Sequence, residues 1–402
     1  VRSRRQRQMC IRDRYWMATE DHDFAEINHF NLFGKKYTWE SEQKGAVGKF
    51  QLDEIAKSIE DLPEKIALFE KAYNKHKNLA DATRYFVNEL FKSEGLLIID
   101  GDDLELKKLL IPTLKKEITE EFSFSEITKT NDQLAKVGYN AQVNPREINL
   151  FYMKENVRER IVKIENIYQV LNTDIQFSQE EILKEIEENP HFFSPNVVLR
   201  PVYQQIILPN LAYIGGPGEL AYWVQLKSVF ENNNTPFPVF IPRNFALYIN
   251  KVSAKKINKL GLKHEELFLE KNLLVQHYLY TNVENEISLN EESKELQQLF
   301  EKIMIKVTAV DASLGGFVGG EEKKMLKDFK NIEKRLKKTE EKKQETELKQ
   351  VENLKDKLFP NNNLQERVEN YLNFAINHPE FIDELFQLFD PFDFRFNTLI
   401  HE

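Results

Sequence analysis

The amino-acid sequence predicts an α/β fold in which helices cover a parallel sheet and a long helical coiled-coil arm follows. Short apolar runs typical of buried parallel strands, such as residues 211–214 and 237–243, alternate with stretches of helical periodicity. Further along, apolar residues recur at the 4-3-4 spacing of a coiled coil, at Met325, Phe329, Ile332 and Leu336.

The first expected strands lie near the N-terminus. Residues 15–19 have the pattern of the end of a buried strand, and the polar residues 20–23 would then lie at its carboxyl edge, where open α/β sheets bind ligands. Residues 30–39 predict a hairpin with a glycine at its turn. Residues 95–101 predict a further buried strand that ends in an acidic turn.

Helical periodicity dominates residues 41–93 and 113–189, and the latter segment has one strand candidate, at residues 147–153. The coiled-coil arm is expected over residues 262–358. Its glycine-rich stretch, residues 315–320, is typical of a helix breaker, so the arm should fold back as a helical hairpin.

The composition limits the kind of protein. No apolar run approaches the roughly 20 residues that a membrane helix needs, so no membrane span is expected. A net charge of −9 argues against nucleic acid as a main partner. The single cysteine, Cys10, allows neither a disulfide framework nor a cysteine-ligated metal site. These features predict a cytoplasmic protein.

Glycines mark the strongest candidate site. The strand at residues 211–214 ends in Gly215, Gly216 and Gly218, and a helix is expected from Glu219. A strand that turns into a helix through glycines can present free N–H groups to a phosphate or carboxylate. The alternative is a tight turn that binds nothing.

An acidic cluster with one imidazole forms a second candidate. Asp21, His22 and Asp23 follow the first strand, and His22 could act as a general acid or base. Adjacent residues cannot all point at one ion, which makes a metal site unconvincing. The alternative is a helix N-cap at Asp21 or Asp23.

Two other polar groups follow expected strands. Arg243, with Asn244 after it, is a candidate anion clamp, or else a surface ion pair. Residues 100–103 lack the spacing of a calcium loop and predict a turn with a helix cap. A polar cluster before the next expected strand, at Tyr139, Asn140, Gln142 and Arg146, could line the same ligand-binding cleft as the other candidate residues.

Several blocks of the sequence resemble one family, the bacillithiol-biosynthesis cysteine-adding enzymes of the BshC type. The resemblance runs in order from residue 15 to the C-terminus. The blocks that carry it are residues 15–28, 98–103, 139–143, 146–152, 199–227, 242–244, 358–360 and 364–370.

The resemblance implies a Rossmann-like core akin to that of class I aminoacyl-tRNA synthetases, with helical insertions and a coiled coil that forms a homodimer. It also implies a ligase that joins cysteine to glucosaminyl-malate in the last step of bacillithiol synthesis. Because ligation to an amine normally needs an activated carboxylate, ATP is the expected co-substrate.

On this interpretation the proton-handling residues are His22, Asp21, Asp23 and Glu219. The residues expected to hold substrate or nucleotide belong to the glycine turn, its flanks and the following strand end: Arg200, Gln204, Gly215, Gly216, Gly218, Tyr222, Trp223, Gln225, Arg243 and Asn244.

The N-terminus departs from the family pattern. Members have an upstream glycine-containing block that forms the first strand and helix of the nucleotide fold, and residues 1–14, with six arginines, stand in its place. We interpret residues 1–14 as an artefactual tail and expect a truncated member with weak activity or none. The remaining expected divisions are partial core 15–40, helical insertion 41–93, core element 94–112, mostly helical insertion 113–189, second core half 190–261, coiled-coil arm 262–358 and helical cap 359–402.

Two alternative functions stay open at this point. The chain could be a non-catalytic scaffold in which the coiled coil does the work. It could also be a synthetase-like nucleotidyltransferase that acts on another amino acid.

Overall fold

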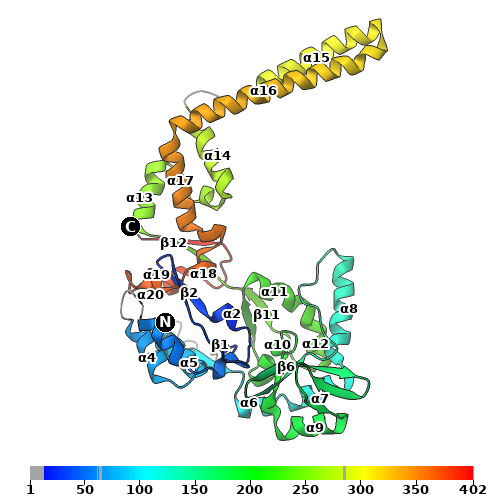
Figure 1. Cartoon of the computed structure of the whole chain (residues 1–402), viewed down its shortest axis with the longest axis vertical. Coiled ribbons are helices and arrows are strands. Elements are labelled where there is room, and N and C mark those ends of the chain that lie inside the picture. The colour runs from blue at the N-terminus through cyan, green and yellow to red at the C-terminus, as the bar shows by residue number, and fades with distance from the viewer. Residues whose placement is uncertain (1–12, 61, 63–65, 284–286, 402) are drawn as a thin grey trace. The chain divides into compact units, whose positions relative to one another are not determined.

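The computed structural model describes residues 13–60, 62, 66–283 and 287–401 (Figure 1). The chain divides into two compact units. The first comprises residues 1–244 with 390–394, and the second comprises residues 245–389 with 395–402. In the described part of the chain, no helix is both long enough and apolar enough to cross a membrane.

Two parallel strand pairs form the centre of the first unit. β1 (Arg14–Met17) pairs with β4 (Leu97–Asp100), and β10 (Ala212–Gly215) pairs with β11 (Val239–Pro242). The prediction of parallel strands is therefore confirmed, although the described strands form separate pairs. Arg14 belongs to β1, so the expected boundary after residue 14 is wrong, and residues 1–12 of the expected tail lie outside the described residues.

The expected hairpin at residues 30–39 is confirmed. β2 (His29–Leu32) and β3 (Lys35–Thr38) pair antiparallel. Gly34 takes φ 77° at the turn, a left-handed conformation that suits glycine.

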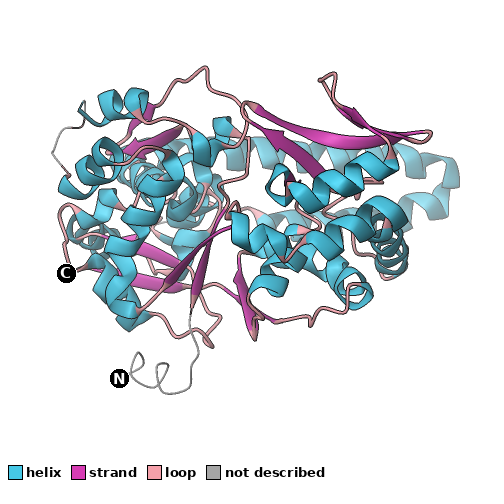
Figure 2. Ribbon diagram, turned by 90° about the horizontal axis from the view of Figure 1, so that it is seen from below, coloured by secondary structure: helices cyan, strands magenta, loops and turns pink. Residues whose placement is uncertain are grey.

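A five-stranded antiparallel sheet was not expected, and its long strands stand out in Figure 2. Its order is β8-β7-β6-β5-β9. The prediction of one strand in a mostly helical segment 113–189 is wrong, because residues 150–177 are mainly strands with charged residues at many outward positions. The bounds are β5 (Leu150–Lys154), β6 (Val157–Ile164), β7 (Ile167–Val170), β8 (Gln176–Phe177) and β9 (Phe193–Pro195).

Helices connect and cover these strands. Their bounds in the first unit are α2 (Phe24–Ile27), α3 (Asp53–Glu60), α4 (Ala67–Lys75), α5 (Leu79–Phe91), α6 (Leu104–Lys108), α7 (Ile111–Glu120), α8 (Phe122–Lys136), α9 (Gln179–Glu188), α10 (Arg200–Ile207), α11 (Pro217–Trp223) and α12 (Lys227–Asn232).

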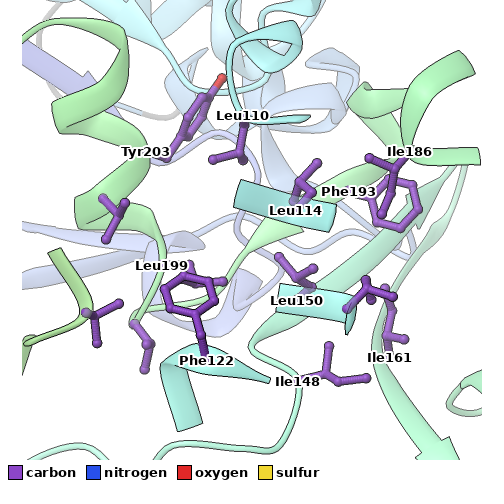
Figure 3. Packing of buried hydrophobic residues seen from close by; sticks show 14 of the residues in the cluster. Leu110, Leu114, Phe122, Ile148, Leu150, Ile161, Ile186, Phe193, Leu199 and Tyr203 are labelled. Carbon is purple, nitrogen blue, oxygen red and sulfur yellow. The ribbon is translucent and has the colours of Figure 1, made fainter. Parts of the chain in front are cut away.

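One apolar core joins the antiparallel sheet to the helices around it. It combines side chains from α7, α8, α9 and α10 with one face of β5, β6 and β9 (Figure 3). Burial of this much apolar surface is the main source of stability for the first unit. The labelled members include Leu110, Leu114, Phe122, Leu150, Ile161, Phe193 and Tyr203.

The second unit has a small parallel pair and a long helical hairpin. β12 (Ala246–Ile249) pairs with β13 (Asn397–Ile400). The helices are α13 (Lys251–Leu260), α14 (Lys271–Thr281), α15 (Asn290–Val310), α16 (Gly315–Lys343), α17 (Glu345–Leu358), α18 (Gln365–Val368), α19 (Leu372–Ala375) and α20 (Phe381–Leu388).

The coiled-coil prediction holds for α15 and α16, which lie side by side, whereas α17 packs into the apolar core of the second unit. The prediction that residues 315–320 break the helix is wrong. Gly315 and Gly316 begin α16, and the chain reverses just before them, where Asp311 accepts a hydrogen bond from the Ser313 amide at 2.8 Å. Asp311 thus begins a short 3-10 turn between the two helices, and the chain reverses without a left-handed glycine.

Candidate functional site at the carboxyl ends of β1 and β4

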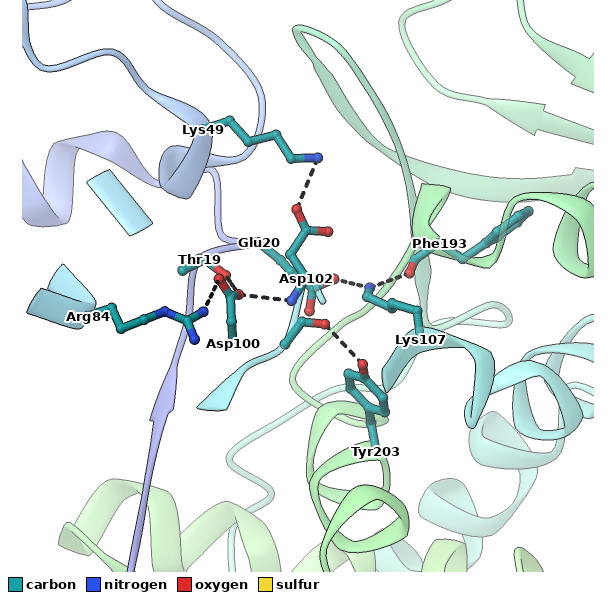
Figure 4. A network of polar contacts seen from close by, with 10 residues as sticks. Thr19, Glu20, Lys49, Arg84, Asp100, Asp102, Lys107, Phe193 and Tyr203 are labelled. Carbon is teal, nitrogen blue, oxygen red and sulfur yellow. Dashed lines mark hydrogen bonds and ion pairs between the residues drawn. The ribbon is translucent and has the colours of Figure 1, made fainter. Parts of the chain in front are cut away.

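Polar side chains gather where β1 and β4 end (Figure 4). Thr19 donates a hydrogen bond to Asp100, which also accepts one from the Asp102 amide at 3.0 Å and from Arg84 at 3.3 Å. Lys49 pairs with Asp102 at 3.0 Å. The expectation that polar residues follow the first strand at its carboxyl edge is confirmed, and the pairing of β1 with β4 brings the acidic turn after β4 to the same edge.

A buried ion pair joins this edge to the antiparallel sheet. Lys107 is fully buried, and its Nζ donates to the Glu20 carboxylate and to the Phe193 carbonyl, the latter at 2.6 Å. Burial raises the pKa of Glu20, and the charge of Lys107 offsets this only in part. The pair therefore fixes the segment after β1 against α6 and β9.

His22 and Asp21 continue this segment and meet Arg158 of β6. Arg158 donates to Nδ1 of His22, and one of its Nη atoms lies 3.7 Å from the Asp21 carboxylate. Because arginine can only donate, Nδ1 of His22 accepts this hydrogen bond, 3.5 Å from the Asp21 carboxylate, and Nε2 is left to face a ligand. His22 is thus placed to donate from Nε2, which suits an orienting role.

Asp21 has a second role within its own turn. Its carboxylate accepts hydrogen bonds from the amides of His22, at 2.7 Å, and Asp23, at 3.4 Å. Burial raises the pKa of Asp21, but these hydrogen bonds and the charge of Arg158 outweigh it and hold the pKa below its usual value. Asp21 therefore caps its own turn and not a helix, and Asp23 precedes α2 without a side-chain cap, so the helix N-cap alternative is wrong for both.

Two arginines near this edge have unused hydrogen-bonding capacity. Arg158 lies over the Phe151 ring, 4.0 Å from its centroid, and Arg200 of α10 donates to the Tyr222 hydroxyl at 3.0 Å. In the described structure, the Nε atom of each is buried without a hydrogen-bond partner. Burial lowers the pKa of Arg158, and the charge of Arg200 lowers it further. Two neighbouring arginines, each with a buried Nε that has no hydrogen-bond partner, are typical of an anion-binding site.

The glycine turn is arranged differently from the prediction. Glu219 accepts hydrogen bonds from the Gly216 amide and from the Tyr213 hydroxyl, both at 3.0 Å. The Tyr213 ring covers the turn, since a Cβ on Gly215 would lie 2.8 Å from it. The prediction that this turn holds an anion is wrong for Gly216, because the carboxylate of Glu219 already takes its amide.

Other residues of the predicted site have structural partners. Trp223 lies in the core and stacks on Tyr213, with ring centroids 3.9 Å apart. Gln225 is fully buried, and its Oε1 accepts from the amides of Gln142 and Val143 at 2.8 and 3.0 Å. Trp223 and Gln225 therefore support the fold, and the prediction that they contact a ligand is wrong.

The remaining predicted residues are spread along the same unit. Gln204 lies on α10, and Gly218 has nothing within 4 Å of the place where a Cβ would be. The Arg243 amide donates to the Gly215 carbonyl at 3.0 Å. Asn244 donates to the carbonyls of Asp390 and Asp393 at 2.9 and 3.1 Å. Of the residues predicted around the glycine turn, Arg200 belongs to the arginine pair, and Tyr222 accepts a hydrogen bond from it.

The acidic turn after β4 behaves as expected. Asp103 precedes α6 and accepts hydrogen bonds from the amides of Glu105 and Leu106 at 2.9 and 3.1 Å. Among the described residues, no group of three or more His, Cys, Asp or Glu side chains is placed to hold a metal ion.

Sequence reasoning missed Lys107 and Arg158. The burial of Lys107 had no clear signal in the sequence, because its short helix is rich in charge and its first leucine, Leu104, is exposed. Arg158 lies in the stretch Val-Arg-Glu-Arg-Ile-Val-Lys-Ile, whose apolar positions do not alternate cleanly, so neither the strand nor the arginine was apparent.

Parallel strand pairs with charged groups at their carboxyl ends, followed by a coiled-coil domain, define a Rossmann-like α/β protein with a helical arm. Comparisons with known proteins agree. Residues 14–244 match the model of the N-terminal Rossmann-like domain of bacillithiol biosynthesis BshC, and residues 246–401 match the model of its C-terminal coiled-coil domain. The chain belongs to the BshC family of bacillithiol biosynthesis.

Relatives with the name "Putative cysteine ligase BshC" align along most of the chain. The protein from Cytophaga hutchinsonii is 44% identical over 391 residues, which are 96% of this chain and 74% of that relative. The one from Flavobacterium johnsoniae is 42% identical, with the same coverage, and the one from Bacillus mycoides is 29% identical over 89% of this chain and 72% of its own.

Proposed function

We propose that this protein is a ligase that joins cysteine to glucosaminyl-malate to make bacillithiol, with ATP as co-substrate. The observation that carries the proposal is the pair Arg158 and Arg200, each with a buried, unpartnered Nε at the carboxyl edge of the parallel strands. Malate has two carboxylates, and guanidinium groups bind carboxylates in a directed, charge-assisted way. The names of the relatives supply the reaction class.

In this proposal the residues around the two arginines orient the sugar conjugate. The His22 ring donates from Nε2, while Asp21 keeps Arg158 charged and in place. The Lys107–Glu20 pair holds this segment rigid. The ligation forms an amide between the cysteine carboxyl carbon and the sugar amine. The amine gives up a proton, and the departing carboxyl oxygen ends on phosphate from ATP.

The glycine turn does not fit a phosphate group in the expected manner, because Glu219 occupies the Gly216 amide. We therefore assign no residue of the glycine turn to the nucleotide. ATP enters the proposal as the acceptor of the departing oxygen and as the source of the driving force.

Product formation tests the proposal. Purified protein is incubated with cysteine, glucosaminyl-malate and ATP, and thiol products are labelled and identified by mass. Bacillithiol should form only when all three are present. An Arg200→Gln variant should lose most of the product, whereas an Arg335→Gln variant, at an exposed position on α16, should not.

Two outcomes would contradict the proposal. Equal yields with other amino acids would favour a synthetase-like nucleotidyltransferase of different specificity. The absence of any product or substrate binding, together with a stable folded chain, would favour a coiled-coil scaffold.

We further propose that the α15–α16 hairpin forms a homodimer. Large apolar side chains remain exposed along it, at Leu299, Ile305, Met325, Ile332 and Leu336. A second copy of the hairpin has the complementary apolar stripe. Sedimentation should show a dimer that an Ile332→Lys variant converts to monomer, while the neighbouring exposed Asn331→Lys does not. A monomeric parent protein would contradict this.

A further inference from the structure

A cationic pocket lies in the first unit, apart from the candidate site. A cavity of about 290 Å³ opens between α8, the loop before β5, and β6. None of its residues belongs to the candidate site at the ends of β1 and β4. The lining is Phe124, Pro145, Arg146, Glu147, Ile148, Arg160, Ile161 and Val162.

A buried carboxylate fixes two walls of this pocket. Glu117 accepts hydrogen bonds from the Ser123 hydroxyl at 2.6 Å and from the Asn149 amide at 2.9 Å. Ser123 directly precedes Phe124, which is one wall. Asn149 in turn accepts from the Arg146 amide at 3.1 Å and donates to the Arg146 carbonyl at 2.7 Å. The loop that carries Arg146 is therefore held in place before any ligand arrives, which favours binding.

The two arginines of the pocket are available to a ligand. Neither the Arg146 nor the Arg160 guanidinium has a hydrogen bond or an ion pair with another of the described residues. Glu147 is the one carboxylate in the lining, so the pocket has an excess of positive charge. Ile148, a member of the core, and Val162, on the same face of β6 as Arg160, supply apolar surface beside the two arginines.

The pocket lies close to the candidate site along one strand. Arg158 and Arg160 are two residues apart on β6, so both point to the same face of the sheet. Phe151 lies directly opposite Arg160 on β5, and Arg158 lies over the same ring. A ligand at Arg160 would therefore be within about 7 Å, along the strand, of a group that we assign to the substrate.

We propose that this pocket binds a small molecule that carries a carboxylate or phosphate on an apolar or aromatic frame. The oxyanion lies between Arg146 and Arg160, and the frame lies against Phe124, Ile148 and Val162. Two guanidinium groups give the pocket charge-assisted, directed hydrogen bonds, and the apolar floor selects against a bare inorganic ion.

Fluorine NMR on the full chain tests this with defined probes. The probes are 4-fluorobenzoate, 4-fluorophenyl phosphate and the uncharged 4-fluorobenzamide. Both anions should bind, and the tighter of the two identifies the preferred oxyanion. Arg160→Gln and Arg146→Gln should each weaken anion binding roughly tenfold or more, because each removes one charge-assisted contact. Arg335→Gln serves as the matched control and should bind like the parent.

The melting temperature of each variant shows whether it is folded. Because Arg146 and Arg160 lie on different elements, the test still stands if one of the two variants fails to fold. Binding of the uncharged amide as tight as that of the anions would overturn the proposal. So would anion affinity unchanged in both pocket variants, or no binding of either anion to the parent protein. The test does not depend on ligase activity, so its failure leaves the proposed function untouched.

Discussion

Replacing Lys107 by methionine tests the buried ion pair beneath the site. Methionine has nearly the same length and volume, so the change removes a charge without creating a cavity. It leaves the Glu20 carboxylate, which is 7% exposed, without its cation, and it leaves the Phe193 carbonyl without its donor. Breaking a buried pair from one side costs about 3–5 kcal/mol.

The double variant Lys107→Met with Glu20→Gln separates the two contributions. It removes the uncompensated carboxylate but still leaves the Phe193 carbonyl unsatisfied, which costs about 1–3 kcal/mol. We therefore expect the double variant to be more stable than Lys107→Met by about 2 kcal/mol, the difference between the two costs.

Urea unfolding followed by tryptophan fluorescence measures this directly. All three tryptophans, Trp16, Trp39 and Trp223, lie in the first unit, so the signal reports on that unit alone. Trp16 also contacts Tyr203 edge-on, with ring centroids 5.5 Å apart, close to the pair. The reasoning would be refuted if Lys107→Met lowered the free energy of unfolding by less than about 1 kcal/mol, or if the double variant were no more stable than the single one.

Two further predictions concern the same region. Gly48→Ala should lower the free energy of unfolding by about 1–3 kcal/mol, because the new Cβ would lie 2.5 Å from the Thr19 Cβ. Gly218→Ala is the control: its new Cβ would meet nothing within 4 Å, so urea unfolding should give nearly the same stability as for the parent protein. Burial lowers the pKa of His191, although Asp102 opposes this, so the folded state prefers the neutral ring. The neutral His191 ring therefore contributes its full share of stability above the ordinary pKa of 6.5, and this contribution is lost as the pH falls through the pKa of the folded state. His191→Phe should therefore melt with a weaker pH dependence below pH 6.5, and an unchanged dependence would contradict the assignment.

Local patterns predicted the parallel strands and the hairpin arm well. The apolar runs at β4, β10 and β11 have few charges, which identified them as strands. The prediction that they are buried is wrong at Leu97, Ile214 and Val239, whose side chains are exposed. The 4-3-4 spacing on α16 identified the coiled coil. The antiparallel sheet was not predicted because β6 mixes arginine, glutamate and lysine with aliphatic residues without a clean alternation, a pattern that charged helices share.

The candidate site depended on contacts that sequence spacing does not reveal. His22 and Arg158 are 136 residues apart, and only the fold brings β6 to the end of β1. The glycine turn misled for a local reason, because Glu219 at the third position of its helix can cap the Gly216 amide itself. A capping residue and a ligand-binding residue have the same signature at that position.

The central claim is that Arg158 binds a carboxylate of the substrate. Calorimetric titration with glucosaminyl-malate, and with a methyl glucosaminide that lacks malate, tests it most directly. We predict that the malate conjugate alone binds, and that Arg158→Gln weakens this binding roughly tenfold or more while Arg335→Gln does not. Equal affinity of the folded Arg158→Gln variant, or equal binding of the sugar without malate, would contradict the account.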